Sequence, residues 1–371
     1  MHHRRDSVRP LASRAFCGLA LCLWLTAAAG HAEPAPLAEQ IEALLSEGPL
    51  ARADVGIHVV ALGTGRVIYA RHQTRPFVAA SNAKLVTAAA ALDALGEGYE
   101  FETTVYADGQ PQGGVLRGDL VLRGGGDPTI GGRYDDEDAM EVLGRWARVL
   151  RARGLRRVTG DVVADDTFFD RVLRHPQWGD YPAWKWYYTC TSALSINDNC
   201  VEVLVRPGAA PGRPALVSVT PSSAPVTLRN TCETSSRLHA IWFDREAGGR
   251  VIRVGGNVRI NTAGYRDEVT VPDPPLYAAA AFRQALQEAG VSVDGGVRLI
   301  EPARAGAVRQ RWGEPLLVRR TALPPVLSTM LKRSHNHYAE QVVKTIGAEA
   351  EGAGTWAAGL ARAGRMLREM G

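Results

Sequence analysis

The sequence has few cysteines and no common zinc-binding motif. Two of its five cysteines fall within the first 32 residues, and the remaining three are Cys190, Cys200 and Cys232. Neither a Cys-x-x-Cys pair nor a His-Glu-x-x-His motif is present. His335 and His337 lie close in sequence, but without further ligands in the pattern we expect no metal site there. The common zinc enzymes and zinc fingers are therefore excluded.

The apolar run near the N-terminus is too short to span a bilayer. Residues 15–29 are apolar, four arginines precede them, and the small residues Gly30 and Ala32 follow. A charged start, a short apolar core and a small-x-small exit are typical of a secretory signal peptide. We therefore expect residues 1–32 to direct export to the periplasm, with cleavage after Ala32. A retained membrane anchor is the alternative.

The sequence also lacks a charge excess of either sign once this segment is set aside. The whole chain carries +4, and residues 1–32 contribute four Arg and one Asp, so residues 33–371 carry 4 − 3 = +1. A nearly neutral chain has no electrostatic basis for binding nucleic acid, and that class is excluded. The 339 residues that remain (371 less 32) are enough for two or more hydrophobic cores.

Export to an oxidising compartment favours one disulfide among the three remaining cysteines. We expect Cys190 to pair with Cys200, because the short loop between them closes easily, and Cys232 to remain a free thiol.

Helical and β-rich patterns alternate along the chain. The periodicity predicts a short helix over 37–45, a hairpin over 55–71 and an Ala-rich helix from Ser81 to Leu95, closed by Gly96. Strands and glycine turns dominate from Phe101 on. A helical pattern returns within that region at 138–153 and 276–289, and again from residue 323 to the end, a stretch that includes Ser334. The pattern changes near residues 98 and 318, which predicts domain boundaries there.

Ser81-Asn-Ala-Lys84 has the form Ser-x-x-Lys. Residues three apart share one face of a helix, so the Lys84 ammonium is expected beside the Ser81 hydroxyl. A lysine desolvated in a cleft loses basicity and can then remove the serine proton. The tetrad taken alone favours a capping serine and a solvated lysine, since such caps are common.

Ser334-His-Asn336 supplies a second element, of the form Ser-x-Asn. Ser-x-x-Lys with Ser-x-Asn and Lys-Thr-Gly is the established signature of penicillin-binding proteins and class A β-lactamases. Ser334 can relay a proton from Lys84 to a leaving nitrogen, and the Asn336 amide can orient the substrate and Lys84.

The surroundings of both motifs make the likeness specific. Residues 80–88 and 330–340, together with 118–129, 160–169 and 354–356, resemble the D-alanyl-D-alanine carboxypeptidase/endopeptidase family of low-molecular-mass (class C) penicillin-binding proteins. These segments follow the family's order through nearly the whole of residues 33–371.

The resemblance implies an α+β fold, with a β-lactamase-like transpeptidase domain of antiparallel sheet and helices interrupted by a large β-rich insertion. The split catalytic domain would comprise 33–98 and 318–371, and the insertion 99–317. The implied chemistry is acyl transfer from peptidoglycan stem peptides to Ser81, assisted by Lys84, Ser334 and Asn336. The resemblance also implies inhibition by β-lactams and no cofactor.

Two features depart from the family pattern. The chain has no Lys-Thr-Gly, the element that binds the substrate carboxylate, so we expect a C-terminally truncated catalytic domain with an incomplete sheet and little activity on its own. Lys344-Thr-Ile-Gly347 contains one residue too many and is expected on a surface helix. The acidic stretch that meets the substrate's diamino acid is replaced by Trp184-Lys-Trp186, with Tyr187 as the predicted contact and Asp180 as the nearest carboxylate.

Three interpretations remain at this point. The chain is an active peptidase, an inactive penicillin-binding relic, or a serine β-lactamase or esterase on the same scaffold. The large insertion and the Ser-x-Asn motif argue against the last.

Overall fold

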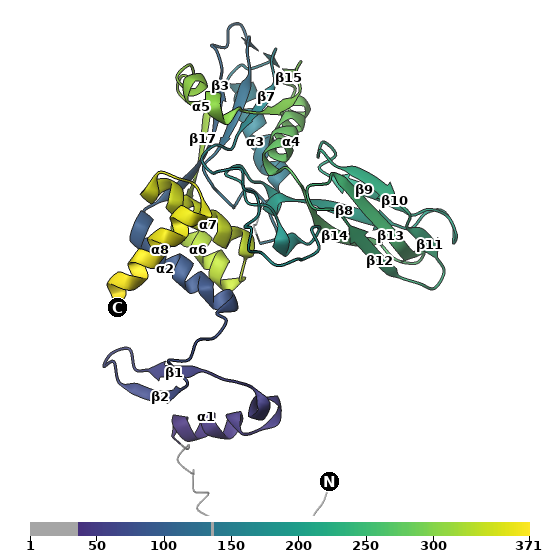
Figure 1. The fold of residues 1–371 in the computed structure, drawn as a ribbon. Helices are drawn as coiled ribbons and strands as arrows, with labels where there is room; N and C mark the ends of the chain where they lie inside the picture. Colours follow the sequence, from purple (N-terminus) through teal and green to yellow (C-terminus); the bar gives the residue numbers. More distant parts are fainter. Residues whose placement is uncertain (1–35, 135–136) are drawn as a thin grey trace, which may run out of the picture. The chain divides into compact units, whose positions relative to one another are not determined.

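The computed structural model describes residues 36–134 and 137–371, which divide into two units (Figure 1). The first extends to Val78, and the second comprises Ala79–Gly371. The expected signal peptide lies outside the described residues. Within the described ranges, no helix combines the length and the apolar character that a bilayer crossing requires.

The first unit contains the predicted short helix and hairpin. Helix α1 (Leu37–Leu45) precedes strands β1 (Ile57–Val60) and β2 (Val67–Arg71), which pair antiparallel with an irregularity between Val59 and Val60. The Tyr69 hydroxyl on β2 donates a 2.6 Å hydrogen bond to the Glu42 carboxylate on α1. The hairpin expectation is confirmed.

Four helices form one cluster in the second unit (Figure 1). They are α2 (Ala83–Leu95), α6 (Leu323–Lys332), α7 (Asn336–Glu351) and α8 (Trp356–Met370). Their shared core includes Ala90, Met330, Tyr338 and Val342, all buried. Helix α2 ends at Gly96, whose φ of 80° is accessible to glycine without steric cost.

The β-rich region is built on a mixed five-stranded sheet in the order β16-β7-β5-β3-β17. Its strands are β3 (Glu100–Ala107), β5 (Leu120–Gly124), β7 (Val162–Asp165), β16 (Val297–Leu299) and β17 (Leu317–Ala322). The predicted helices appear as α3 (Ala139–Ala152) and α4 (Pro274–Glu288), and α4 packs on β7 and β16. The helix α3 begins where the Asp138 side chain accepts from the Met140 and Glu141 amides, a typical N-cap.

Three smaller sheets complete this region. One pairs β8 (Cys200–Arg206) with β9 (Leu216–Thr220) and β14 (Tyr265–Thr270). In the second, β13 (Val251–Arg259) pairs with β10 (Thr227–Asn230), β11 (Glu233–Ser235) and β12 (Ala240–Asp244). The third consists of β4 (Val115–Leu116), β6 (Arg157–Val158) and β15 (Ser292–Val293). The α+β expectation is confirmed, and strands are frequent after Phe101, as predicted.

Two antiparallel strands connect the helical cluster with the β-rich region. Strand β3 leaves the cluster and β17 returns to it, with Ala322 opposite Glu100. The Leu323 amide, at the start of α6, donates to the Tyr99 carbonyl at 2.9 Å. Entry and exit therefore lie side by side, as an insertion into a domain requires.

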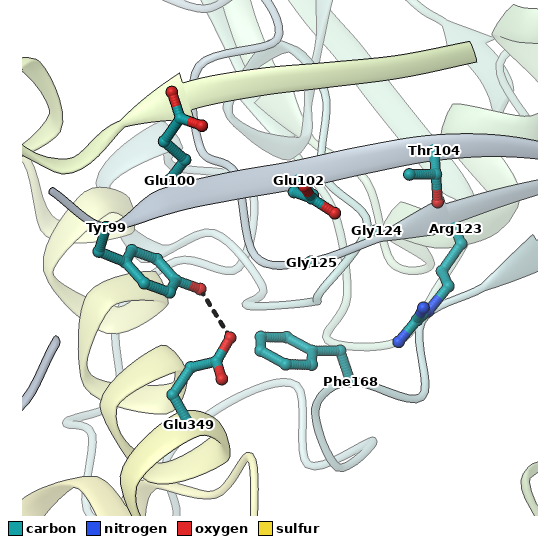
Figure 2. A pocket seen from close by; sticks show the side chains of 9 residues that line it. All are labelled: Tyr99, Glu100, Glu102, Thr104, Arg123, Gly124, Gly125, Phe168 and Glu349. Atoms are coloured by element: carbon teal, nitrogen blue, oxygen red, sulfur yellow. Dashed lines mark hydrogen bonds between the residues drawn. The ribbon is translucent and has the colours of Figure 1, made fainter. Parts of the chain in front are cut away.

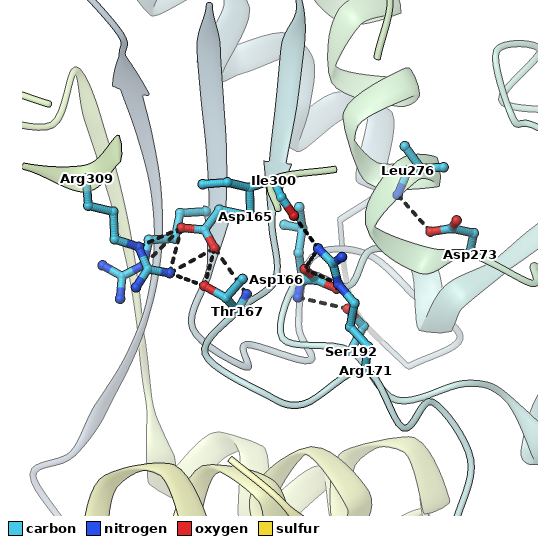
Figure 3. A network of polar contacts seen from close by, with 11 residues as sticks. Asp165, Asp166, Thr167, Arg171, Ser192, Asp273, Leu276, Ile300 and Arg309 are labelled. Atoms are coloured by element: carbon cyan, nitrogen blue, oxygen red, sulfur yellow. Dashed lines mark hydrogen bonds and ion pairs between the residues drawn. The ribbon is translucent and has the colours of Figure 1, made fainter. Parts of the chain in front are cut away.

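Buried ion pairs hold the segment after β7 (Figure 3). Asp165 is fully buried and accepts from the Arg309 guanidinium of α5 (Pro302–Arg309) at 2.8–2.9 Å. Asp166 accepts from Arg171, which also donates to the Ile300 carbonyl at 2.7 Å. These pairs tie α5 and the end of β16 to the strand, which gives Asp165 a structural role.

The expectations for the cysteines and for the position of Ser334 are wrong. Cys190, Cys200 and Cys232 are all free and buried, so the expected Cys190–Cys200 disulfide is absent. Burial raises the pKa of each thiol, which keeps it protonated and unreactive. Ser334 does not lie within a helix but in the break between α6 and α7, because its φ of 54° is incompatible with a right-handed helix.

Candidate active site

Ser81 and Lys84 lie together at the start of α2. Ser81 is exposed in a single 3₁₀ turn (Ala80–Asn82), and Lys84 is the second residue of the helix that follows. The Lys84 Nζ lies 3.4 Å from the Ser81 Oγ. The local spacing therefore places amine and hydroxyl as the motif predicts.

Ser334 and Asn336 are brought to the same place from the far end of the sequence. The Ser334 Oγ donates to the Ser81 Oγ at 2.7 Å, across 253 positions of sequence. The Lys84 Nζ donates to the Asn336 Oδ1 at 2.8 Å, and the Asn336 Nδ2 donates to the Tyr187 carbonyl at 3.2 Å. Two hydroxyls, an amine and an amide thus form one continuous hydrogen-bonded set.

Two residues at this hydrogen-bonded set have a strained backbone. Ala80, directly before Ser81, has a φ of 47°, and Ser334 has a φ of 54°. Such left-handed conformations at residues other than glycine each cost about 1–3 kcal/mol and concentrate at functional sites. The two serines that contact each other therefore lie in turns that depart from right-handed helical geometry.

The charge of Lys84 is set by burial and by one carboxylate. The side chain is only 8% exposed, and this desolvation lowers its pKa, while the charge of Glu340 opposes the shift. Burial raises the pKa of Glu340, although a 2.5 Å hydrogen bond from the Trp356 Nε1 and the charges of Lys84 and Lys344 counter the rise. A lysine with a lowered pKa is suited to act as a base.

Two cavities adjoin the set. One has a volume of ≈ 310 Å³, and its lining includes Lys84, Asn336, Glu340 and Trp356. The other, of ≈ 320 Å³, is lined by Trp178, Gly179, Tyr181, Tyr187, Tyr188, Asn336 and Glu340. Tyr187, which the sequence analysis expected to contact the substrate, thus lines the second cavity. The carboxylate in the lining is Glu340 and not Asp180, which was the nearest in the sequence.

Glu340 was not singled out from the sequence, although one signal was available. It follows Asn336 by four positions, and residues four apart share a helix face. Among the described residues, no group of three or more His, Cys, Asp or Glu side chains is arranged to hold a metal ion.

Lys344-Thr-Ile-Gly347 lies on α7 as predicted, but it is not on the surface. Lys344 and Thr345 are fully buried. The Lys344 Nζ donates to the Asp170 Oδ1 at 2.5 Å and to the Val172 carbonyl at 2.8 Å, and it lies 3.9 Å from the Trp356 ring centroid. This lysine attaches the helix to the insertion.

Removing the partner of Lys344 should destabilise the fold. Asp170→Ala leaves a buried ammonium without its carboxylate, and we expect a loss of about 3 kcal/mol in the free energy of unfolding. Urea denaturation followed by circular dichroism measures it. Lys344→Met, which removes the charge along with its need for a partner, should cost clearly less. Equal losses in the two variants would contradict this assignment.

A separate cavity, lined by residues of β3, β5 and α7, shares no residue with the Ser81 site (Figure 2). Its carboxylates are already partnered. The Tyr99 hydroxyl donates to Glu349 at 3.0 Å, and Arg320 contacts Glu102 at 2.9 Å and Glu100 at 3.8 Å. We assign this cavity no ligand.

Two curated proteins are similar to this chain in sequence. A D-alanyl-D-alanine carboxypeptidase of Actinomadura sp. is 35% identical over 346 residues, which cover 90% of this chain and 62% of the relative. The D-alanyl-D-alanine carboxypeptidase DacB of Haemophilus influenzae is 23% identical over 298 residues, or 79% and 59% of the two chains. This chain thus spans about three fifths of the length of these relatives.

Solved structures agree on the fold. The crystal structure of penicillin binding protein 4 (dacB) from Haemophilus influenzae aligns with a TM-score of 0.69 at 22% identity, covering 85% of this chain and 67% of that one. A second structure of that protein, complexed with a β-lactam, aligns with a TM-score of 0.62 at 21% identity, covering 85% and 66%. The model of the D-Ala-D-Ala carboxypeptidase 3 (S13) family matches residues 37–371, and the chain therefore belongs to that family of peptidases.

Proposed function

We propose that this protein is a serine-type D-alanyl-D-alanine carboxypeptidase/endopeptidase that acts on peptidoglycan stem peptides through an acyl-enzyme on Ser81. The observation that carries the proposal is the hydrogen-bonded set itself. The Ser81 Oγ lies 2.7 Å from one possible proton carrier, Ser334, and 3.4 Å from another, Lys84. The membership of the family and the names of the relatives point to the same chemistry.

The residues divide the acylation step between them. Lys84, as the neutral amine, accepts the Ser81 proton while the Ser81 Oγ attacks the carbonyl carbon between the two D-alanines. The start of α2 contributes partial positive charge toward the developing oxyanion. The proton then moves from Lys84 through the Ser334 hydroxyl to the leaving nitrogen, whose bond to the carbonyl carbon breaks and releases D-alanine or a cross-linked strand. Water then hydrolyses the ester and restores Ser81.

Asn336 and Tyr187 are proposed to position the substrate. Asn336 accepts from Lys84 and donates to the Tyr187 carbonyl, so its amide fixes the lysine and the aromatic segment together. The Tyr187 side chain is 39% exposed in the aromatic cavity beside this set. It is suited to contact the diamino acid of the stem peptide.

The proposal extends to domain organisation and location. Residues 33–98 and 318–371 are proposed to form the split catalytic domain, and 99–317 the insertion. The adjacent entry and exit strands and the separate core of the helical cluster support this division of the second unit. A cell-wall substrate also agrees with export to the periplasm. By the same chemistry, β-lactams are proposed as acylating inhibitors; the β-lactam complex of the Haemophilus influenzae protein is consistent with this.

The test uses the full-length protein, meaning residues 33–371 extended through the Lys-Thr-Gly element that this sequence lacks. It measures the release of D-alanine from a pentapeptide ending in D-Ala-D-Ala. We expect release from this peptide and none from a matched peptide ending in L-Ala-L-Ala. Deacylation after penicillin should be slow, since a peptidase remains trapped as the acyl-enzyme. Rapid turnover of penicillin without D-alanine release would instead identify a β-lactamase.

A further inference from the structure

A buried ion pair joins the Ser-x-Asn segment to the insertion. The His335 Nε2 lies 3.2 Å from the Asp198 Oδ2, and the two side chains are 1% and 2% exposed. A carboxylate only accepts hydrogen bonds, so Nε2 carries the proton. His335 directly follows Ser334, whose hydroxyl contacts Ser81. The ion pair therefore lies one residue from Ser334, a member of the proposed proton path.

Asp198 is held rigidly on its side of the contact. Its Oδ2 accepts from the Arg133 amide at 2.9 Å, and a Cβ at Gly132 would come within 2.8 Å of its Oδ1. Asp198 is the middle of three consecutive residues with φ between 51° and 55°. Burial raises the pKa of Asp198, but the hydrogen bonds and charges that it receives outweigh this, and its pKa is lowered. The carboxylate is thus a fixed, ionised anchor.

The imidazole of His335 is enclosed by aromatic rings. Its centroid lies 4.6 Å from that of Tyr338, 5.4 Å from that of Tyr134 and 5.9 Å from that of Trp186. The neighbouring His337 ring is at 6.3 Å, and burial lowers the pKa of His337 to about 4, so it stays neutral. The ring of His335 accordingly has little freedom to turn away from Asp198.

A second contact fastens the same helix to the same loop. The Gln341 Nε2, on α7, donates to the Ser192 carbonyl at 2.9 Å and to the Ser195 Oγ at 2.8 Å. The two contacts join residues 335–341, the N-cap and first turns of α7, to residues 192–199 of the insertion. The insertion is therefore attached directly behind the catalytic Ser-x-Asn segment.

Two other roles for the pair fail on geometry. Serine, histidine and aspartate suggest a relay, but the remaining ring nitrogen of His335, Nδ1, is buried without a partner among the described residues, so it reaches neither serine. A metal site is also excluded, because these side chains form no metal-holding group within the described part of the chain.

We propose that Asp198 and His335 are positioning residues that hold Ser334 in its left-handed conformation and thereby keep its hydroxyl against Ser81. This inference rests on the proposed function of Ser81 and Ser334. The reason lies in the backbone conformation of Ser334. Ser334 has a strained backbone between α6 and α7, and a strained conformation persists only where its surroundings fix it. The anchored imidazole next to it supplies that restraint.

The test separates the rate of acylation from the amount of folded protein. Stopped-flow mixing of the full-length protein with a fluorescent penicillin gives the limiting acylation rate constant, and the final labelled fraction gives the folded amount. Asp198→Asn and His335→Met should slow acylation about 10- to 100-fold, the scale of a small misplacement of reacting groups, with the labelled fraction unchanged. His335→Gln, which keeps an N–H donor, should recover most of the rate.

Wild-type acylation rates in both Asp198→Asn and His335→Met would overturn the proposal. A lower labelled fraction at an unchanged rate would also overturn it, because that result indicates a merely structural role for the pair. A readout without acylation distinguishes these results from failure of the proposed function. In crystal structures, the distance between the Ser334 and Ser81 hydroxyls should exceed hydrogen-bonding range in Asp198→Asn but not in the wild type. An unlabelled wild type would contradict the proposed function, whereas an unchanged distance in Asp198→Asn would contradict this inference.

Discussion

Ser81→Ala should abolish covalent labelling by a fluorescent penicillin. The Ser81 Oγ is the exposed hydroxyl that lies against both Lys84 and Ser334, and without it no ester can form. Loss of the nucleophile from a serine hydrolase lowers turnover by about 10⁶-fold. Gel fluorescence of the purified protein measures labelling, and mass spectrometry of the wild type should place the adduct on the peptide that contains Ser81.

The matched control is Ser222→Ala, which removes an exposed hydroxyl from the insertion and should leave labelling intact. Circular dichroism should show the same fold in all three proteins, since Ser81 is exposed and contributes little to the core. Labelling that persists in Ser81→Ala would show that another side chain is the nucleophile.

Lys84→Ala should slow acylation by roughly 10²–10⁴-fold, the usual contribution of a general base. The pH dependence follows from the direction of the pKa shift. Only the neutral amine accepts a proton, so the wild-type rate rises with pH and levels off once Lys84 is deprotonated. Burial lowers its pKa, and the rate should therefore level off at a lower pH than an ordinary lysine would give. This rising limb should be absent in Lys84→Ala.

Glu340→Gln is a second variant for the same measurement of acylation rate against pH. The charge of Glu340 raises the pKa of Lys84, and removing it should move the midpoint of the rising limb to lower pH. Glutamine keeps an oxygen for the Trp356 Nε1, so the local packing should survive. Rate profiles from pH 5 to 10 would show the shift. An unchanged midpoint in Glu340→Gln, or a rising limb that survives in Lys84→Ala, would mean that another group is the base.

The local parts of the site follow from the sequence. Ser81 and Lys84 are three residues apart at the start of an Ala-rich helix, and helical geometry alone places them on one face. The hairpin of the first unit and the end of α2 at Gly96 follow in the same way from strand alternation and turn residues. The pairing of Ser-x-x-Lys with Ser-x-Asn indicated the family, because the chemistry needs both elements.

Contacts between distant residues depended on packing that no local pattern encodes. Asn336 contacts Lys84 across 252 positions of sequence. The insertion starts on β3 and ends on β17, and because these strands are paired, the chain returns to the helical cluster that it left. The helical period of α7 predicted a helix at Lys344 but not its burial. A lysine is normally solvated, and here Asp170 and the Val172 carbonyl, which are distant in sequence, accept hydrogen bonds from the buried ammonium. The cysteine count and the short loop suggested a disulfide, yet all three thiols are free and buried.

Helix periodicity, capping residues and motif spacing depend on neighbours within a few positions, and these are the features that could be inferred before the fold was known. The desolvation of Lys84, the left-handed turn at Ser334 and the anchor from Asp198 to His335 depend on which surfaces meet after folding. A side chain's pKa and a strained backbone are properties of its surroundings, and segments distant in sequence supply those surroundings.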